Sequence, residues 1–158
     1  DPDTGPIEML ELDQWQRRID VNLTGAFLLV KHTVPHLRQR RGSIVNIAST
    51  GGLIGYSGGS AYCVSKAALI MLTKVLALEL APLRIRANCV CPGAVNTPMV
   101  PSKSRKRIAN QIPIGRIGLP KEIAQLVFYL ASKHAKQITG ATFVVDGGVT
   151  AGRIRLVD

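Results

Sequence analysis

Apolar residues in the first quarter of the chain recur at steps of three and four positions. The repeating positions are Trp15, Ile19, Leu23, Phe27, Val30, Val34 and Leu37. This spacing matches the 3.6-residue period of an α-helix and places these side chains on one face. The pattern therefore predicts a long helix over residues 12–37 with a single buried stripe.

Further along, short apolar runs alternate with longer segments of helical spacing. Residues 43–49 have the nearly continuous apolar character of a strand that is covered on both faces, and residues 85–91 and 141–146 are predicted as two further short strands. Residues 61–80 and 121–132 have the periodicity of helices. Strands that are separated by helices require crossover connections, which join parallel strands. The sequence thus predicts an α/β fold with a parallel sheet.

A polar and basic segment interrupts this alternation between residues 97 and 119. It includes Lys103, Arg105, Lys106 and Arg107 and lacks a helical or strand period. Long insertions of this kind are usually lids or binding loops, so we expect residues 99–119 to form a lid over the substrate. No internal repeat divides the chain, and residues 1–158 are expected to form part of one domain.

The formal charge of +10 raises the possibility of a nucleic-acid partner. Aromatic residues make up only 4% of the chain, and no nucleic-acid motif accompanies the charge, so we expect no such partner. The richest apolar stretch, residues 67–80, is interrupted by Lys74 and Glu79, and we expect no membrane span. Residues 1–6 lack the pattern of a signal peptide, which favours a cytoplasmic location.

The three cysteines, Cys63, Cys89 and Cys91, lie in apolar surroundings. Their spacing does not match that of a zinc site, which needs a third and a fourth ligand. We therefore expect reduced thiols and no bound metal.

Candidate chemistry gathers around Tyr62 and Lys66, which are four residues apart in a predicted helix and so share one face. An ammonium beside a phenol favours the phenolate, which would let Tyr62 exchange a proton as an acid/base catalyst. Ser49 lies at the carboxyl end of its predicted strand, where open parallel sheets bind ligands. Pro92 and Gly93 follow the next strand at the same end.

Each of these features is weak alone, because turns use serine, proline and glycine routinely and the spacing of Tyr62 and Lys66 is common by chance. The ordered combination is specific. It extends to these segments: Asp20-Val-Asn22-Leu, Asn46-Ile-Ala-Ser49, Tyr62-Cys-Val-Ser-Lys66, Ile85-Arg-Ala-Asn88, Pro92-Gly93 with Thr97, and Val145-Asp-Gly-Gly148. Together they resemble the short-chain dehydrogenase/reductase family across nearly the whole chain.

The resemblance implies a catalytic tetrad of Asn22, Ser49, Tyr62 and Lys66. Tyr62 would be the general acid/base, Ser49 would polarise the reacting oxygen, Lys66 would hold the nicotinamide ribose, and Asn22 would anchor a water in a proton relay. The residues implied in cofactor binding are Tyr62, Lys66, Pro92, Gly93, Val95 and Thr97. The cofactor would be NAD or NADP, since hydride passes between a nicotinamide and the substrate carbon.

The same resemblance implies an oxidoreductase acting on an alcohol or ketone, either a small molecule or a carrier-bound group as in 3-oxoacyl-carrier-protein reductases. It also implies a homo-oligomer, a tetramer or a dimer, built through the helices at about 12–38 and 61–80.

In the family, a Gly-rich turn before the present residue 1 binds the pyrophosphate. We therefore expect the chain to be the C-terminal, catalytic part of a doubly wound Rossmann fold that binds dinucleotide poorly by itself. The alternative is an inactive fragment that retains only assembly surfaces.

Overall fold

The computed structural model describes residues 5–152 and contains a three-stranded sheet. The strands are β1 (Ser43–Ile47), β2 (Arg86–Pro92) and β3 (Thr142–Val145), and they lie in the order β1-β2-β3. Both pairings are parallel, with Ile47 opposite Val90 and Pro92 opposite Val145. The predicted α/β class and parallel sheet are confirmed.

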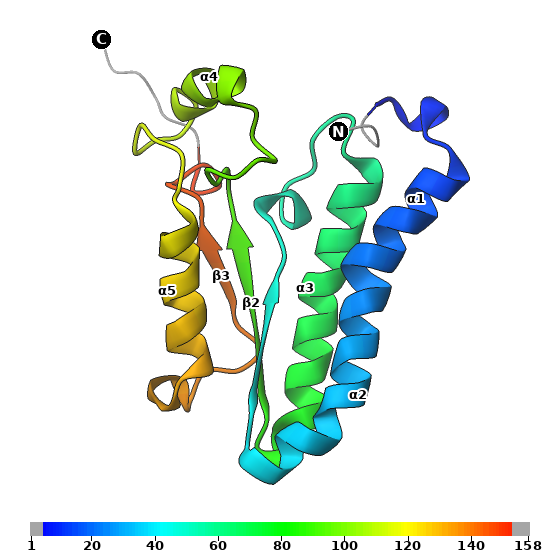
Figure 1. Ribbon diagram of the computed structural model, residues 1–158, viewed down its shortest axis with the longest axis vertical. Coiled ribbons are helices and arrows are strands. Elements are labelled where there is room, and N and C mark those ends of the chain that lie inside the picture. Colours follow the sequence, from blue (N-terminus) through cyan, green and yellow to red (C-terminus); the bar gives the residue numbers. More distant parts are fainter. Residues whose placement is uncertain (1–4, 153–158) are drawn as a thin grey trace.

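Helices cover the sheet on both faces (Figure 1). On one face lie α2 (Gly25–Arg40) and α3 (Ser60–Leu80), and on the other lies α5 (Pro120–Ala131). Because successive residues of a strand point to opposite faces, β2 contributes to two separate cores. Cys89 and Cys91 pack under α3, whereas Val90 packs against Leu130 of α5. This two-sided burial explains the continuous apolar run in the sequence.

The long first helix is present but is not uniform. It comprises α1 (Leu12–Ile19), a π-helical segment (Asp20–Thr24) and α2, which follow one another directly. The predicted buried stripe is only partly correct. Val30 is buried and Val34 packs against the same core, but Phe27 is 46% exposed.

The helix from Ser60 to Leu83, which includes α3, is long and apolar enough to cross a membrane by its length and composition alone. The sequence had suggested a shorter apolar stretch. One such helix is weak support for a membrane span, and here α3 packs on the sheet through residues such as Leu69, Ile70 and Leu80.

The basic insertion is more ordered than its sequence pattern predicted. It contains a short helix, α4 (Arg105–Ala109), and the side chain of Ile112 is buried. The backbone N–H of Ile114 donates to the carbonyl oxygen of Gly147 at 3.2 Å. The end of the insertion is therefore fixed to the loop that follows β3.

Candidate active site

Ser49 lies just beyond the carboxyl end of β1, where it organises the turn that follows. Its Oγ accepts a hydrogen bond from the backbone N–H of Gly51 at 3.1 Å and so begins the 3-10 turn Thr50–Gly52. This turn packs tightly against α3. A Cβ added to Gly52 would lie 2.7 Å from the carbonyl carbon of Lys66, and one added to Gly51 would lie 3.3 Å from the Tyr62 ring.

Tyr62 and Lys66 lie on the face of α3 that meets this turn, so the predicted helical pairing is confirmed. The Lys66 Nζ is 5.9 Å from the centre of the Tyr62 ring. It also donates a hydrogen bond to the carbonyl oxygen of Ile47, the last residue of β1, at 3.0 Å. Burial lowers the pKa of the Lys66 ammonium, while the thiols of Cys89 and Cys91 act in the opposite direction.

Asn22 lies in the π-helical segment, which faces the beginning of α3. Its Nδ2 donates to the Ser65 Oγ at 3.0 Å, and that hydroxyl donates to the carbonyl oxygen of Tyr62 at 2.8 Å. The chain of two hydrogen bonds ties Asn22 to the helical turn that carries Tyr62. Single-turn π segments are frequent at functional sites.

Ser65, which links Asn22 to Tyr62, is fully buried in the structure. The sequence analysis did not identify it. The only signal available was a small polar residue in an apolar helix, three positions after Tyr62.

The second wall of the site follows β2. Gly93 lies so close to β3 that an added Cβ would be 2.8 Å from the Cβ of Asp146. Beyond it, Val95 pairs with Gly118 in an isolated parallel bridge, and the Thr97 N–H donates to the Val95 carbonyl oxygen at 2.8 Å. The loop after Pro92 is thus held in place by the end of the basic insertion.

Asp146 closes the neighbouring loop, which is the structural role that its position at a strand end favours. Its carboxylate accepts hydrogen bonds from the backbone N–H groups of Gly148 and Thr150, each at 2.8 Å. Burial by itself would raise the pKa of Asp146, but these hydrogen bonds outweigh that effect and lower it.

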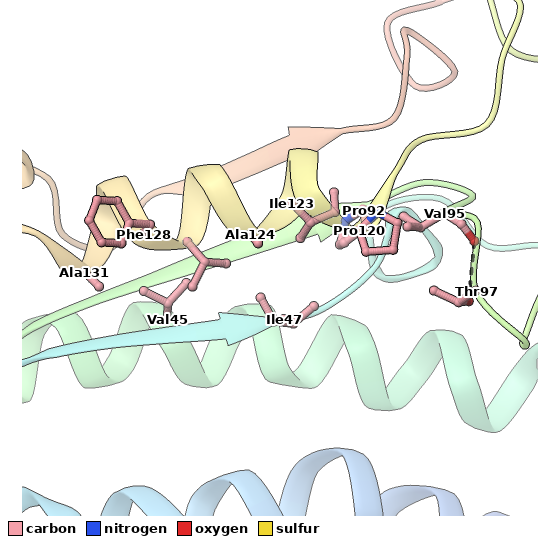
Figure 2. A pocket seen from close by; sticks show the side chains of 11 residues that line it. Val45, Ile47, Pro92, Val95, Thr97, Pro120, Ile123, Ala124, Phe128 and Ala131 are labelled. Atoms are coloured by element: carbon pink, nitrogen blue, oxygen red, sulfur yellow. Dashed lines mark hydrogen bonds between the residues drawn. The ribbon is translucent and has the colours of Figure 1, made fainter.

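An apolar cavity of about 710 Å³ opens between β1, the loop after β2, and α5 (Figure 2). Pro92, Val95 and Thr97 line one end, as Figure 2 shows, while Val45 and Phe128 lie toward the other. The sequence predicted the three residues at the first end but not the lining from α5. The lining of the cavity is almost entirely apolar.

The structure therefore brings the predicted residues to one end of the sheet in two groups. The first group is Asn22, Ser49, Tyr62 and Lys66, and the second is Pro92, Gly93, Val95 and Thr97. Within residues 5–152, no group of three or more His, Cys, Asp or Glu side chains is close enough to hold a metal ion. The three cysteines are free thiols.

Known proteins resemble the chain over almost its whole length. A family described as Enoyl-(Acyl carrier protein) reductase matches residues 2–150. Trans-4-hydroxycyclohexanecarboxylate dehydrogenase of Sinomonas cyclohexanicum is 43% identical over 148 residues, which are 94% of this chain and 56% of that protein. The 3-oxoacyl-[acyl-carrier-protein] reductase of Thermotoga maritima is 43% identical over 147 residues, 90% of this chain and 59% of that protein.

A solved structure of 4-hydroxyisoleucine dehydrogenase complexed with NADH superposes with a TM-score of 0.86 at 38% identity. The superposition covers 95% of this chain and 65% of that one. The chain thus spans somewhat more than half the length of the curated relatives described above.

Proposed function

The chain belongs to the short-chain dehydrogenase/reductase family, and on that premise we propose that the full-length protein is an NAD(P)-dependent oxidoreductase that interconverts an alcohol and a ketone. The observation that carries this proposal is the arrangement at the carboxyl end of the sheet. The Tyr62 ring lies against the turn that begins at Ser49. The centre of this ring is 5.9 Å from the Lys66 Nζ.

Tyr62 is the proposed acid/base. In the oxidising direction, its phenolate oxygen takes the hydroxyl proton of the alcohol, and a carbonyl forms as hydride leaves the carbon. The Ser49 hydroxyl donates a hydrogen bond to the reacting oxygen, and the Lys66 charge favours the phenolate. Asn22 supports this pair through Ser65 and the first turn of α3, and its proposed water relay remains a prediction.

The second wall fits a nicotinamide cofactor. A nicotinamide bound there would supply the hydride acceptor or donor that no side chain can provide. Pro92, Val95 and Thr97 line an apolar cavity that suits the ring, and the close approach of Gly93 to Asp146 leaves no room for a side chain between them. Tyr62 and Lys66 would meet the adjoining ribose, since hydroxyl and ammonium donors suit its hydroxyl groups.

The proposed substrate is a small-molecule or carrier-bound carbonyl or alcohol. Two of the similar proteins are named for hydroxylated substrates that carry a carboxylate, and a third for an acyl-carrier-protein substrate. The proposed lid, residues 99–119, carries several basic side chains, which would suit an anionic substrate if the segment closes over the site. A solvated basic surface is the alternative explanation for those charges. A cytoplasmic location remains a prediction.

Replacing Tyr62 tests the acid/base assignment. In the full-length protein, Tyr62→Phe removes only the phenol oxygen and is expected to lower kcat by roughly 10²- to 10⁴-fold. Turnover is followed at 340 nm with NAD⁺ and NADP⁺ and a panel of hydroxy acids, sugars and steroids.

Tyr129→Phe on α5 is the matched control and should keep full activity. Wild-type activity in Tyr62→Phe would contradict the mechanism.

A second candidate is an inactive protein that serves only assembly. It is favoured by large apolar side chains that are exposed on α2 and α3. These are Phe27, Leu28, Leu29, Met71, Val75 and Leu78. Such a surface suits a homodimer or homotetramer. Size-exclusion chromatography beside the activity assay separates the two functions, because an oligomer without turnover would favour assembly alone.

A further inference from the structure

A second cation approaches Tyr62 from outside α3. Arg18, on α1 (Leu12–Ile19), places its guanidinium carbon 6.0 Å from the centre of the Tyr62 ring. The Lys66 Nζ is at almost the same distance, 5.9 Å, but belongs to α3 and reaches toward β1. Two positive groups from different helices therefore lie about equally far from the centre of the Tyr62 ring.

The charge of Arg18 also affects the pKa of two neighbouring groups. After burial, Arg18 is one of the influences that lower the pKa of Lys66. Burial raises the pKa of the Tyr56 phenol, and Arg18 opposes that shift. The position of Arg18 beside the Tyr62 ring is given by the 6.0 Å distance, and the charge effects on Tyr56 and Lys66 agree with it.

The proposed function, on which this inference rests, requires Tyr62 to carry negative charge during alcohol oxidation. We propose that Arg18 is a positioning residue that holds the Tyr62 ring and supplies a second positive charge that favours its phenolate. The attraction between a cation and an aromatic face orients the ring, and the charge acts on the phenol oxygen through space.

Arginine is suited to this role in a way that Lys66 is not. A guanidinium stays protonated across the whole working range of an enzyme, whereas burial makes the Lys66 ammonium easier to deprotonate. Arg18 therefore preserves a positive charge beside Tyr62 at alkaline pH, where alcohol oxidation is favoured by the release of a proton.

Other titratable groups near Tyr62 can modify its charge. Tyr56 interacts with it from the loop before α3, and Cys63 follows it on the helix. Asp20, in the π-helical segment, accepts hydrogen bonds from Gln16 and Thr24, which engage its carboxylate locally. Arg18 and Lys66 are the two cations that lie over the Tyr62 ring, at 6.0 and 5.9 Å from its centre.

The test compares pH profiles of kcat/KM for alcohol oxidation in the full-length protein. A unit charge 6.0 Å away in a water-like medium corresponds to about half a pH unit. The acidic limb of Arg18→Gln should therefore move to higher pH by at least about that amount. In Arg18→Lys, which keeps the positive charge, the acidic limb should lie close to its wild-type position. A purely structural role of Arg18 would not predict this recovery.

Arg17→Gln is the matched control, because it makes the same charge change at an exposed neighbour on α1. Its profile should coincide with that of the wild type. If the Arg18→Gln profile also coincides with the wild-type profile while turnover persists, the role of Arg18 is overturned and the proposed function stands.

A second measurement does not need turnover. Tyrosinate absorbance near 295 nm is titrated in wild type and in Tyr62→Phe, and the difference isolates the Tyr62 phenol. The difference curve should shift to higher pH in an Arg18→Gln background. An unmoved curve overturns the inference even if no substrate is found, whereas a shifted curve without turnover would support it and count against the proposed function alone.

Discussion

The two faces of the sheet differ in how completely this chain covers them. Under α3 the contacts are closed: Cys89 and Cys91 are fully buried, and the Asn46 Nδ2 donates to the buried Thr73 hydroxyl at 2.9 Å. Under α5 the apolar cavity is open, and the side chains of Ile47 and Phe128 are 41% and 78% exposed. The residues that we propose for proton transfer thus lie on the face of the sheet that this chain covers completely.

The comparison separates two tasks within one sheet. Acid/base groups must be held within a few tenths of an ångström, and a dense core provides that rigidity. The α5 face leaves apolar area exposed in a chain that spans 56% of the length of one relative and 59% of another.

Removing side chains from α5 gives the largest expected difference. Leu130 is fully buried and Phe128 is largely exposed, although both belong to one helix. Leu130→Ala should lower the free energy of unfolding of this chain by about 2–5 kcal/mol. Phe128→Ala should change it by less than about 0.5 kcal/mol. Urea denaturation followed by circular dichroism measures both.

Equal losses for the two variants would contradict the comparison. A different result would be that Phe128→Ala lowers the free energy of unfolding strongly in the full-length protein but not in this chain. That result would refine the comparison, because other parts of the protein would then cover the α5 face.

A change on the α3 face should have a smaller effect on stability. A Cβ at Gly52 would overlap the Lys66 backbone, whereas one at Gly55 would meet nothing within 4 Å. Gly52→Ala is therefore expected to cost about 1–3 kcal/mol and Gly55→Ala almost nothing. In the full-length protein, Gly52→Ala should also reduce turnover, since it displaces the turn from Tyr62. Thermal unfolding measures the change in stability, and kcat measures the change in turnover. If Gly52→Ala changes neither, the contact between the turn and α3 is less tight than the comparison requires.

The smallest expected effect is a pH dependence at the start of α5. The Glu122 carboxylate accepts a hydrogen bond from the Arg116 guanidinium at 2.9 Å, and also one from the Leu119 N–H. These bonds lower the pKa of Glu122 from 4.5 to about 2. A lowered carboxylate pKa contributes stability that is present above about 4.5 and is lost as the pH falls toward 2.

The Tm of wild type should therefore exceed that of Glu122→Gln at pH 7, and the difference should shrink at pH 3. A difference that grows on acidification would contradict the sign.

The fold followed from local pattern because strands and helices here have strong periods. The pairing of Tyr62 with Lys66 was predictable for the same reason, since four residues in a helix always share a face. The π-helical segment at Asn22 was not predictable, because it depends on packing against α3 rather than on its own residues. Arg18 could not be identified from the sequence, because it approaches Tyr62 from another helix.

The hydrogen bond from Lys66 to the Ile47 carbonyl oxygen has one more consequence. The Lys66 side chain thereby connects α3 to the last residue of β1. An ammonium has three N–H donors, and this bond occupies one, which leaves two for other partners. Much of the rotational freedom of a long, flexible side chain is thus lost when the protein folds, and less remains to be lost when a ligand arrives.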